Sequence, residues 1–192
     1  MKLPKEYYLQ KKVLPIAKDL IGKVLVTKIN GMLTSGVICE TEAYNGIVDK
    51  ASHSFGGRRT PRTETMYAEG GIAYIYLCYG IHHLFNVVTN TADNPHAVLI
   101  RGIEPLDGIK DICLRKNISQ PKKNMGIGPG NISTCLGITT GLNQADLTGN
   151  KIWIEDRGIK VIQKNIIVGA RVGIDYAGED ANLPYRFQYW FK

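Results

Sequence analysis

Three strand-like segments follow one another between residues 72 and 105, and no helical pattern separates them. They read IAYIYLCYG, HHLFNVVTN and HAVLIRGIEP, and are rich in the β-branched and aromatic residues that strands favour. Two more β-rich segments flank Asn30-Gly31, a pair typical of a type I′ hairpin turn. Strands in runs favour an α+β fold with a largely antiparallel sheet over a parallel sheet that alternates with helices.

Helical spacing lies mostly outside this strand-rich region. Apolar residues between positions 6 and 21 predict an amphipathic helix that is kinked or restarted at Pro15. Shorter helices are expected from Thr60, over residues 106–116 and near residues 131–137. The C-terminal third predicts three short strands, at residues 151–156, 160–164 and 170–176.

Length and charge restrict the class of protein. The 192 residues are expected to form a single domain, residues 1–192. The sequence has no long apolar run and no apolar leader, so we expect no membrane association and a cytoplasmic location. The net charge of +7 favours a polyanionic partner such as nucleic acid, although a basic protein that binds no nucleic acid could carry the same charge for solubility.

Cysteine and histidine spacings give no sign of a metal site. The four cysteines form no C-x-x-C pair, and the four histidines form no zinc pattern. There is no G-x-G-x-x-G segment after a strand and no phosphate-binding P-loop. We therefore expect free, buried thiols, no metal and no cofactor.

The segment ETEAY carries two carboxylates and a phenol on one face of a predicted strand. Alternation of side chains along the strand places Glu40, Glu42 and Tyr44 together. One interpretation is an edge strand that faces water. The other is a carboxylate that acts as a general base and activates water.

A basic loop and a tyrosine at a turn follow along the chain. The segment ASHSFGGRRTPR places Arg58 and Arg62 after His53, and such a loop is either a phosphate-binding element or a solvated surface. Tyr76 lies within a strand, whereas Tyr79 falls at a turn before a glycine. A tyrosine in that position suits an exposed aromatic wedge between base steps.

Two polar residues interrupt apolar strands. Asn86 lies in LFNVV and Arg101 in VLIRGIEP. A buried arginine is costly without a partner, and Glu42 and Glu104 are the candidates. A structural ion pair is the alternative to a functional one.

Taken in order, these segments resemble the alkyladenine (3-methyladenine) DNA glycosylase family of the mammalian type. The resemblance extends from about residue 15 to residue 189 and includes MGIGPG and RVGIDYAGED. It implies a curved antiparallel sheet with a protruding hairpin and peripheral helices. It also implies a monomer that flips damaged purines out of duplex DNA and excises them by hydrolysis.

The resemblance further implies roles for individual residues. Glu42 matches the general base, Arg101 the residue that holds the water and carboxylate, and Tyr79 the intercalating tyrosine. Other matches are the stacking residues Tyr44, His53 and Tyr76, the guanine-rejecting Asn86 and a supporting Asp175. Arg58 and Arg62 of the basic loop are expected to contact phosphates. His82 and His83 depart from the mammalian pattern. The alternative is a nucleic-acid-binding module without catalysis, which would have no need of Glu42 with Arg101.

Overall fold

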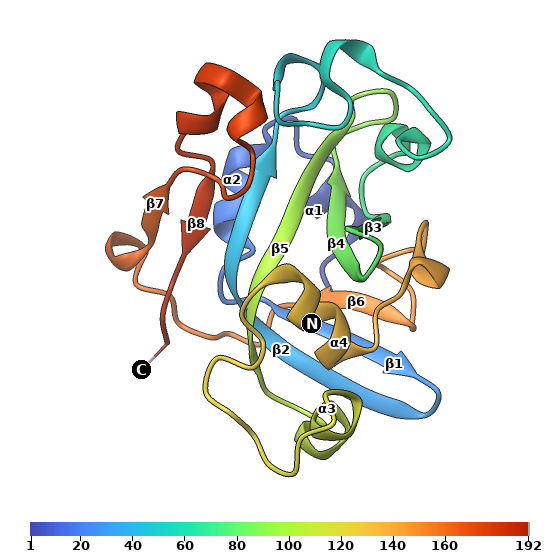
Figure 1. Cartoon of the computed structure of the whole chain (residues 1–192), viewed down its shortest axis with the longest axis vertical. Helices are drawn as coiled ribbons and strands as arrows, with labels where there is room; N and C mark the ends of the chain where they lie inside the picture. The colour runs from blue at the N-terminus through green and yellow to red at the C-terminus, as the bar shows by residue number, and fades with distance from the viewer. Residues whose placement is uncertain (192) are drawn as a thin grey trace.

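The computed structural model describes residues 1–191, and a single eight-stranded antiparallel sheet forms its framework (Figure 1). Neighbouring strands follow the order β3-β4-β5-β2-β1-β6, while β8 pairs with both β2 and β7. The strands are β1 (Val24–Ile29), β2 (Met32–Tyr44), β3 (Ala73–Cys78), β4 (His82–Thr89), β5 (His96–Pro105), β6 (Ile152–Glu155), β7 (Ile167–Gly169) and β8 (Arg186–Gln188). The expected α+β fold with a curved, antiparallel sheet is confirmed.

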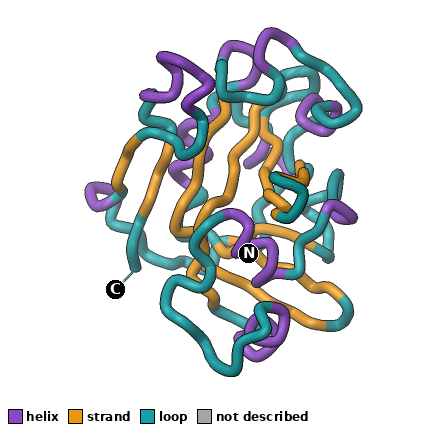
Figure 2. The backbone as a smooth tube through the Cα atoms, in the orientation of Figure 1, coloured by secondary structure: helices purple, strands orange, loops and turns teal. Residues whose placement is uncertain are grey.

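Short helices surround this sheet (Figure 2). The α-helices are α1 (Lys5–Tyr8), α2 (Val13–Asp19), α3 (Ile109–Arg115) and α4 (Pro129–Leu136). The 3-10 helices are η1 (Gly46–Val48), η2 (Phe55–Gly57), η3 (Glu64–Tyr67), η4 (Thr140–Leu142), η5 (Gln163–Asn165) and η6 (Asp175–Asn182). None of the helices within residues 1–191 has the length and apolar character that a membrane span requires.

The hairpin of β1 and β2 turns at the pair that the sequence indicates. Asn30 has φ 51° and Gly31 has φ 79°, the positive values that a type I′ turn requires. Beyond this turn, β2 is 13 residues long and changes partner along one edge. Its first half pairs with β1 and its second half with β8, while β5 pairs along its other edge. The register between β2 and β5 shifts around Glu40, so a bulge marks the change.

Alternation along the strands divides the side chains between two faces of the sheet. One face carries Phe85 of β4 and Ile100 of β5, which belong to the main apolar core together with Ile16 of α2 and Ile132 of α4. On β2, the Thr41 hydroxyl donates a hydrogen bond to the Ala17 carbonyl of α2. Residues one position away point to the opposite face. That face receives Glu42, Tyr44, Tyr74, Tyr76, Asn86, Leu99 and Arg101.

Four local expectations differ from the structure. The expected N-terminal helix is two helices, and the break between them precedes Val13 instead of falling at Pro15. Pro15 fits in the first turn of α2, because the backbone N–H groups of a first turn have no intrahelical acceptor. The segment from Thr60 forms turns before η3 begins at Glu64. Residues 160–164 and 170–176 form loops and 3-10 turns, not strands. Cys78 is half-buried, whereas the other three free cysteines are buried.

Candidate active site

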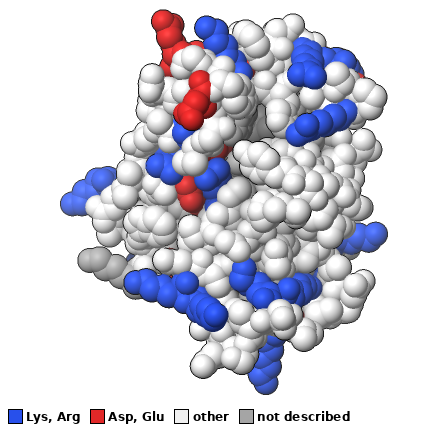
Figure 3. Space-filling view, viewed as in Figure 1, with Lys and Arg blue, Asp and Glu red and all other residues white. Residues whose placement is uncertain are grey.

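The face of the sheet opposite α2 and α4 encloses a cavity of about 310 Å³. Figure 3 shows a hollow on the side of the molecule that faces the viewer, with Lys and Arg side chains along its right rim. Six predicted site residues line the cavity: Tyr44, His53, Arg62, Tyr76, Tyr79 and Asn86. Residues far away along the chain, among them Ile174 and Tyr176, close its other side.

Aromatic rings form the inner wall of the cavity. The rings of His53 and Tyr76 lie 4.8 Å apart, edge to face, and Nδ1 of His53 is 2.8 Å from the hydroxyl of Tyr74. Burial, with added repulsion from Arg62 and Arg58, lowers the pKa of His53 to about 4. The imidazole is therefore neutral at neutral pH, and the wall presents electron-rich rings to the cavity.

One ion-pair partner and two hydrogen-bond donors surround the Glu42 carboxylate, which is completely buried. The Arg101 Nε lies 3.3 Å from Oε1, and the backbone N–H of Val172 donates to Oε1 at 2.8 Å. The Tyr44 hydroxyl donates to Oε2 at 3.0 Å. Burial nevertheless raises the pKa of Glu42, and Arg101, Val172 and Tyr44 oppose that rise. Tyr44 also lines the cavity, so its hydroxyl connects the cavity wall to the carboxylate.

Arg101 has a second carboxylate partner that differs from the expected Glu104. Its Nε is 3.3 Å from Oε1 of Glu40, and Arg186 of β8 approaches the same oxygen at 3.3 Å. Glu40 and Glu42 are both buried, and β2 lies inside the sheet, with β5 along one edge and β1 and β8 along the other. The structure thereby excludes the interpretation of ETEAY as a water-facing edge strand.

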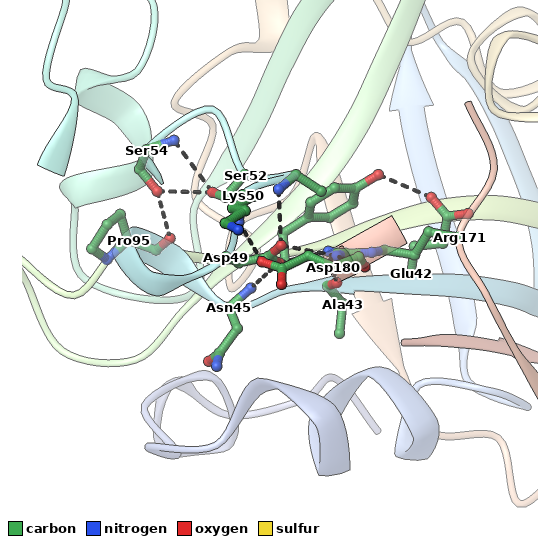
Figure 4. Close-up of polar contacts among 12 residues, drawn as sticks. Glu42, Ala43, Asn45, Asp49, Lys50, Ser52, Ser54, Pro95, Arg171 and Asp180 are labelled. Carbon is green, nitrogen blue, oxygen red and sulfur yellow. Dashed lines mark hydrogen bonds and ion pairs between the residues drawn. The ribbon is translucent and has the colours of Figure 1, made fainter. Parts of the chain in front are cut away.

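A buried ion pair beside Glu42 is not evident from the sequence. The Arg171 guanidinium contacts the Asp49 carboxylate at 2.6 and 2.8 Å, and both side chains are almost fully buried (Figure 4). Arg171 also donates to the Ala43 carbonyl at 2.9 Å and stacks on Tyr44 with 4.8 Å to the ring centroid. The only sign of this pair in the sequence is the charge of Arg171 within the segment RVGIDY, which the sequence predicts to be a strand.

The remaining predicted residues occupy different depths. Tyr79 lies at the tip between β3 and β4, is 90% exposed and has φ 51°. Asn86 is buried, and its amide donates to the Tyr74 carbonyl at 3.1 Å. Arg58 is exposed, while Arg62 places its guanidinium 5.0 Å above the Tyr76 ring.

Three further residues lie outside the cavity lining. Asp175 is exposed at the start of η6. The His83 Nδ1 accepts a hydrogen bond from the Thr140 backbone N–H, and His82 packs against Gly130 of α4. These contacts attach the turn end of the β3–β4 hairpin to α4 and η4.

A buried carboxylate next to an aromatic cavity, with an exposed tyrosine and arginines at the mouth, is typical of an enzyme that acts on a base flipped out of a duplex. The site thus has the features of a DNA glycosylase. The chain belongs to the methylpurine-DNA glycosylase (MPG) family, whose model matches residues 7–190.

Relatives of similar length share this family. A Chlamydia abortus protein named "Putative 3-methyladenine DNA glycosylase" is 47% identical over 191 residues, which cover 99% of each chain. Proteins of the same name from Clostridium perfringens and Bacillus cereus are each 43% identical, over 97% and 98% of this chain and 95% and 96% of their own. All three are bacterial, so the comparisons support the family and not the mammalian subdivision.

Proposed function

We propose that this protein is a monofunctional glycosylase of base excision repair, which hydrolyses the N-glycosidic bond of alkylated or deaminated purines of the 3-methyladenine class in duplex DNA. The observation that carries the proposal is the Glu42 carboxylate, buried behind the cavity-lining Tyr44 and held by two hydrogen bonds and the Arg101 ion pair. Burying a carboxylate is expensive unless it is paired, and Tyr44, whose hydroxyl bonds to this one, lines the cavity.

In the proposed reaction, Glu42 accepts a proton from the water that attacks the sugar C1′. The new C1′–O bond replaces the C1′–N bond, whose electron pair leaves with the purine. Arg101 orients the water and the carboxylate. An N3- or N7-alkylated purine already carries positive charge, so its departure needs no general acid. Among residues 1–191, no lysine lines the cavity and could form a Schiff base with the sugar. This favours hydrolysis over lyase chemistry.

The flipped base would stack among Tyr44, His53 and Tyr76. A neutral His53 and the phenol rings favour a cationic base through cation–π attraction. The amide of Asn86 lies on the same side of the sheet, and its hydrogen bond to the Tyr74 carbonyl fixes its orientation. A fixed amide there would clash with the exocyclic amine of guanine and so discriminate against that normal base.

DNA would approach the face that carries the hollow in Figure 3. Tyr79 would enter the gap left by the flipped nucleotide, because its side chain is exposed at the tip of a hairpin. Arg58 and Arg62, beside the cavity mouth, would contact phosphates. We further propose that residues 1–192 act as one domain, as a monomer, on chromosomal DNA in the cytoplasm.

The test is the Glu42→Gln variant on duplex DNA treated with a methylating agent. Single-turnover release of 3-methyladenine should fall by about 10²–10⁴, because an amide cannot accept the proton. Binding to the lesion-containing duplex should stay close to that of the wild type. Glu104→Gln is the matched control, since Glu104 lies on the neighbouring strand and outside the cavity lining. Rapid release by the Glu42 variant would refute the proposed general base.

A further inference from the structure

The Asp49 carboxylate gathers four donors from two separate loops. Besides the two guanidinium bonds from Arg171, it accepts the backbone N–H of Asn45 at 2.9 Å and that of Ala51 at 3.0 Å (Figure 4). These bonds use both oxygens of Asp49, whose side chain is 1% exposed. One carboxylate therefore ties the loop after β2 to the loop that precedes η6.

The second loop is the one that reaches Glu42. Arg171 is anchored by Asp49, by the Ala43 carbonyl and by the Asp180 carbonyl at 3.3 Å. The next residue, Val172, points its backbone N–H at Oε1 of Glu42. Val172 itself has an exposed side chain, so its N–H is positioned by its neighbours in the chain, the anchored Arg171 before it and the buried Ile174 after it.

We infer that Asp49 and Arg171 are positioning residues for the general base, since their ion pair fixes the Val172 N–H that holds the Glu42 carboxylate. The inference rests on the proposed function, in which Glu42 accepts the proton. Asp49 does not contact Glu42 itself and acts through Arg171 and the loop.

The effect of this positioning can be separated from the effect of charge. The titratable and charged groups that face Glu42 are Arg101 from β5, Glu40 and Tyr44 from β2, Arg171 from the loop before η6, and Tyr176 from η6. Arg186 of β8 faces Glu40. The Val172 hydrogen bond lowers the pKa of Glu42, so losing it raises that pKa. The charge of Arg171 acts in the opposite direction, because a nearby cation lowers the pKa of a carboxyl group. A rise in the pKa of Glu42 in a variant that keeps this charge therefore reports the lost hydrogen bond.

The experiment measures the pH dependence of single-turnover 3-methyladenine release by Asp49→Asn and Arg171→Lys. Both variants keep a positive charge at position 171 but lose the two-pronged ion pair. We expect the acidic limb of the rate profile to move to higher pH by about one unit in both, since a carboxylate loses a charge-assisted hydrogen bond. Arg157→Lys is the matched control, because Arg157 pairs with Asp107 at 2.6 Å far from the cavity, and its profile should not move.

Each result has a definite meaning. A fall in rate that is equal at every pH, or a limb that moves to lower pH, would overturn the positioning role. The pH at which the acidic limb falls does not depend on the fraction of the protein that is folded. If Asp49→Asn folds poorly, the profile of Arg171→Lys tests the positioning role. Glu42→Gln is measured in the same assay. If that variant is inactive while the limb stays in place, the positioning inference fails alone; if it is active, the proposed function and the inference fail together.

Discussion

His53 shows how burial sets the charge of a single residue in this site. Its pKa falls from 6.5 to about 4 on folding, so the unfolded chain binds a proton more readily than the native one between these values. Stability should therefore decrease as the pH falls from 6.5 to 4, and His53 should contribute at most about 3 kcal/mol to that loss. The partial exposure of the ring reduces the figure.

Urea unfolding at a series of pH values would measure this contribution. His53→Gln should show a flatter decline in the free energy of unfolding below pH 6.5 than the wild type. His82→Gln, which changes an exposed histidine, should keep the wild-type decline. Equal slopes for His53→Gln and the wild type would show that the ring does not titrate as described.

The same scale shows what could be inferred from single residues. Arg101 was found because an arginine inside an apolar strand demands a partner, and Glu42 proved to be one. Glu40 was not identified as the second partner, because its burial depends on β8, which joins β2 from far along the chain. Arg171 and Asp49 were missed for a related reason. Both lie in loops, where a charged side chain is ordinarily solvated.

At the scale of elements, the β3–β4 hairpin separates a packing tyrosine from an exposed one. Tyr74 is 2% exposed and Tyr79 is 90% exposed on the same short strand and its turn. Tyr79→Asn should leave the free energy of unfolding within about 0.5 kcal/mol of the wild-type value, since asparagine tolerates a positive φ and no buried contact is lost. Lesion binding and excision should both decrease.

Tyr74→Ala supplies the contrast in the same measurements. Truncation of a buried ring should cost about 3–5 kcal/mol of stability. A large loss of stability in Tyr79→Asn, accompanied by normal excision per folded molecule, would mean that Tyr79 packs against the protein and is not a wedge.

Elements with strong local signals were predictable, and those fixed by distant contacts were not. Asn30-Gly31 specified its hairpin because few other residue pairs accept two positive φ values. The segments at 160–164 and 170–176 have strand-like residues but pair with no strand, and only β7 between them joins the sheet, through β8. The strand propensity of a residue reflects how well its side chain packs on a half-buried sheet surface. A segment with high propensity therefore forms a strand only where a neighbouring strand is there to pair with it.

For the whole molecule, the net charge of +7 predicts a steep dependence of DNA binding on salt. The logarithm of the affinity for undamaged duplex should decrease linearly with the logarithm of the salt concentration. Arg58→Ala should reduce the slope by about one unit, because one phosphate contact is lost. The neighbouring Arg59 is a matched control, since it is already paired with Glu64 and Asp93 at 2.7 Å. Arg59→Ala should keep the wild-type slope, and an unchanged slope for Arg58→Ala would place Arg58 away from DNA.

The change of partner along β2 also has a consequence for synthesis of the protein. Glu42 lies 130 positions before Val172, and its strand is bordered at that point by Arg186 of β8. A nascent chain of 165 residues already contains β1 to β6, yet Glu42 then lacks its N–H donor and its neighbouring strand, which are still to be synthesised. The nascent chain therefore carries the carboxylate without the environment that orders it. The capacity to excise a base would therefore arise only when the last part of the chain, with Val172 and β8, has been synthesised.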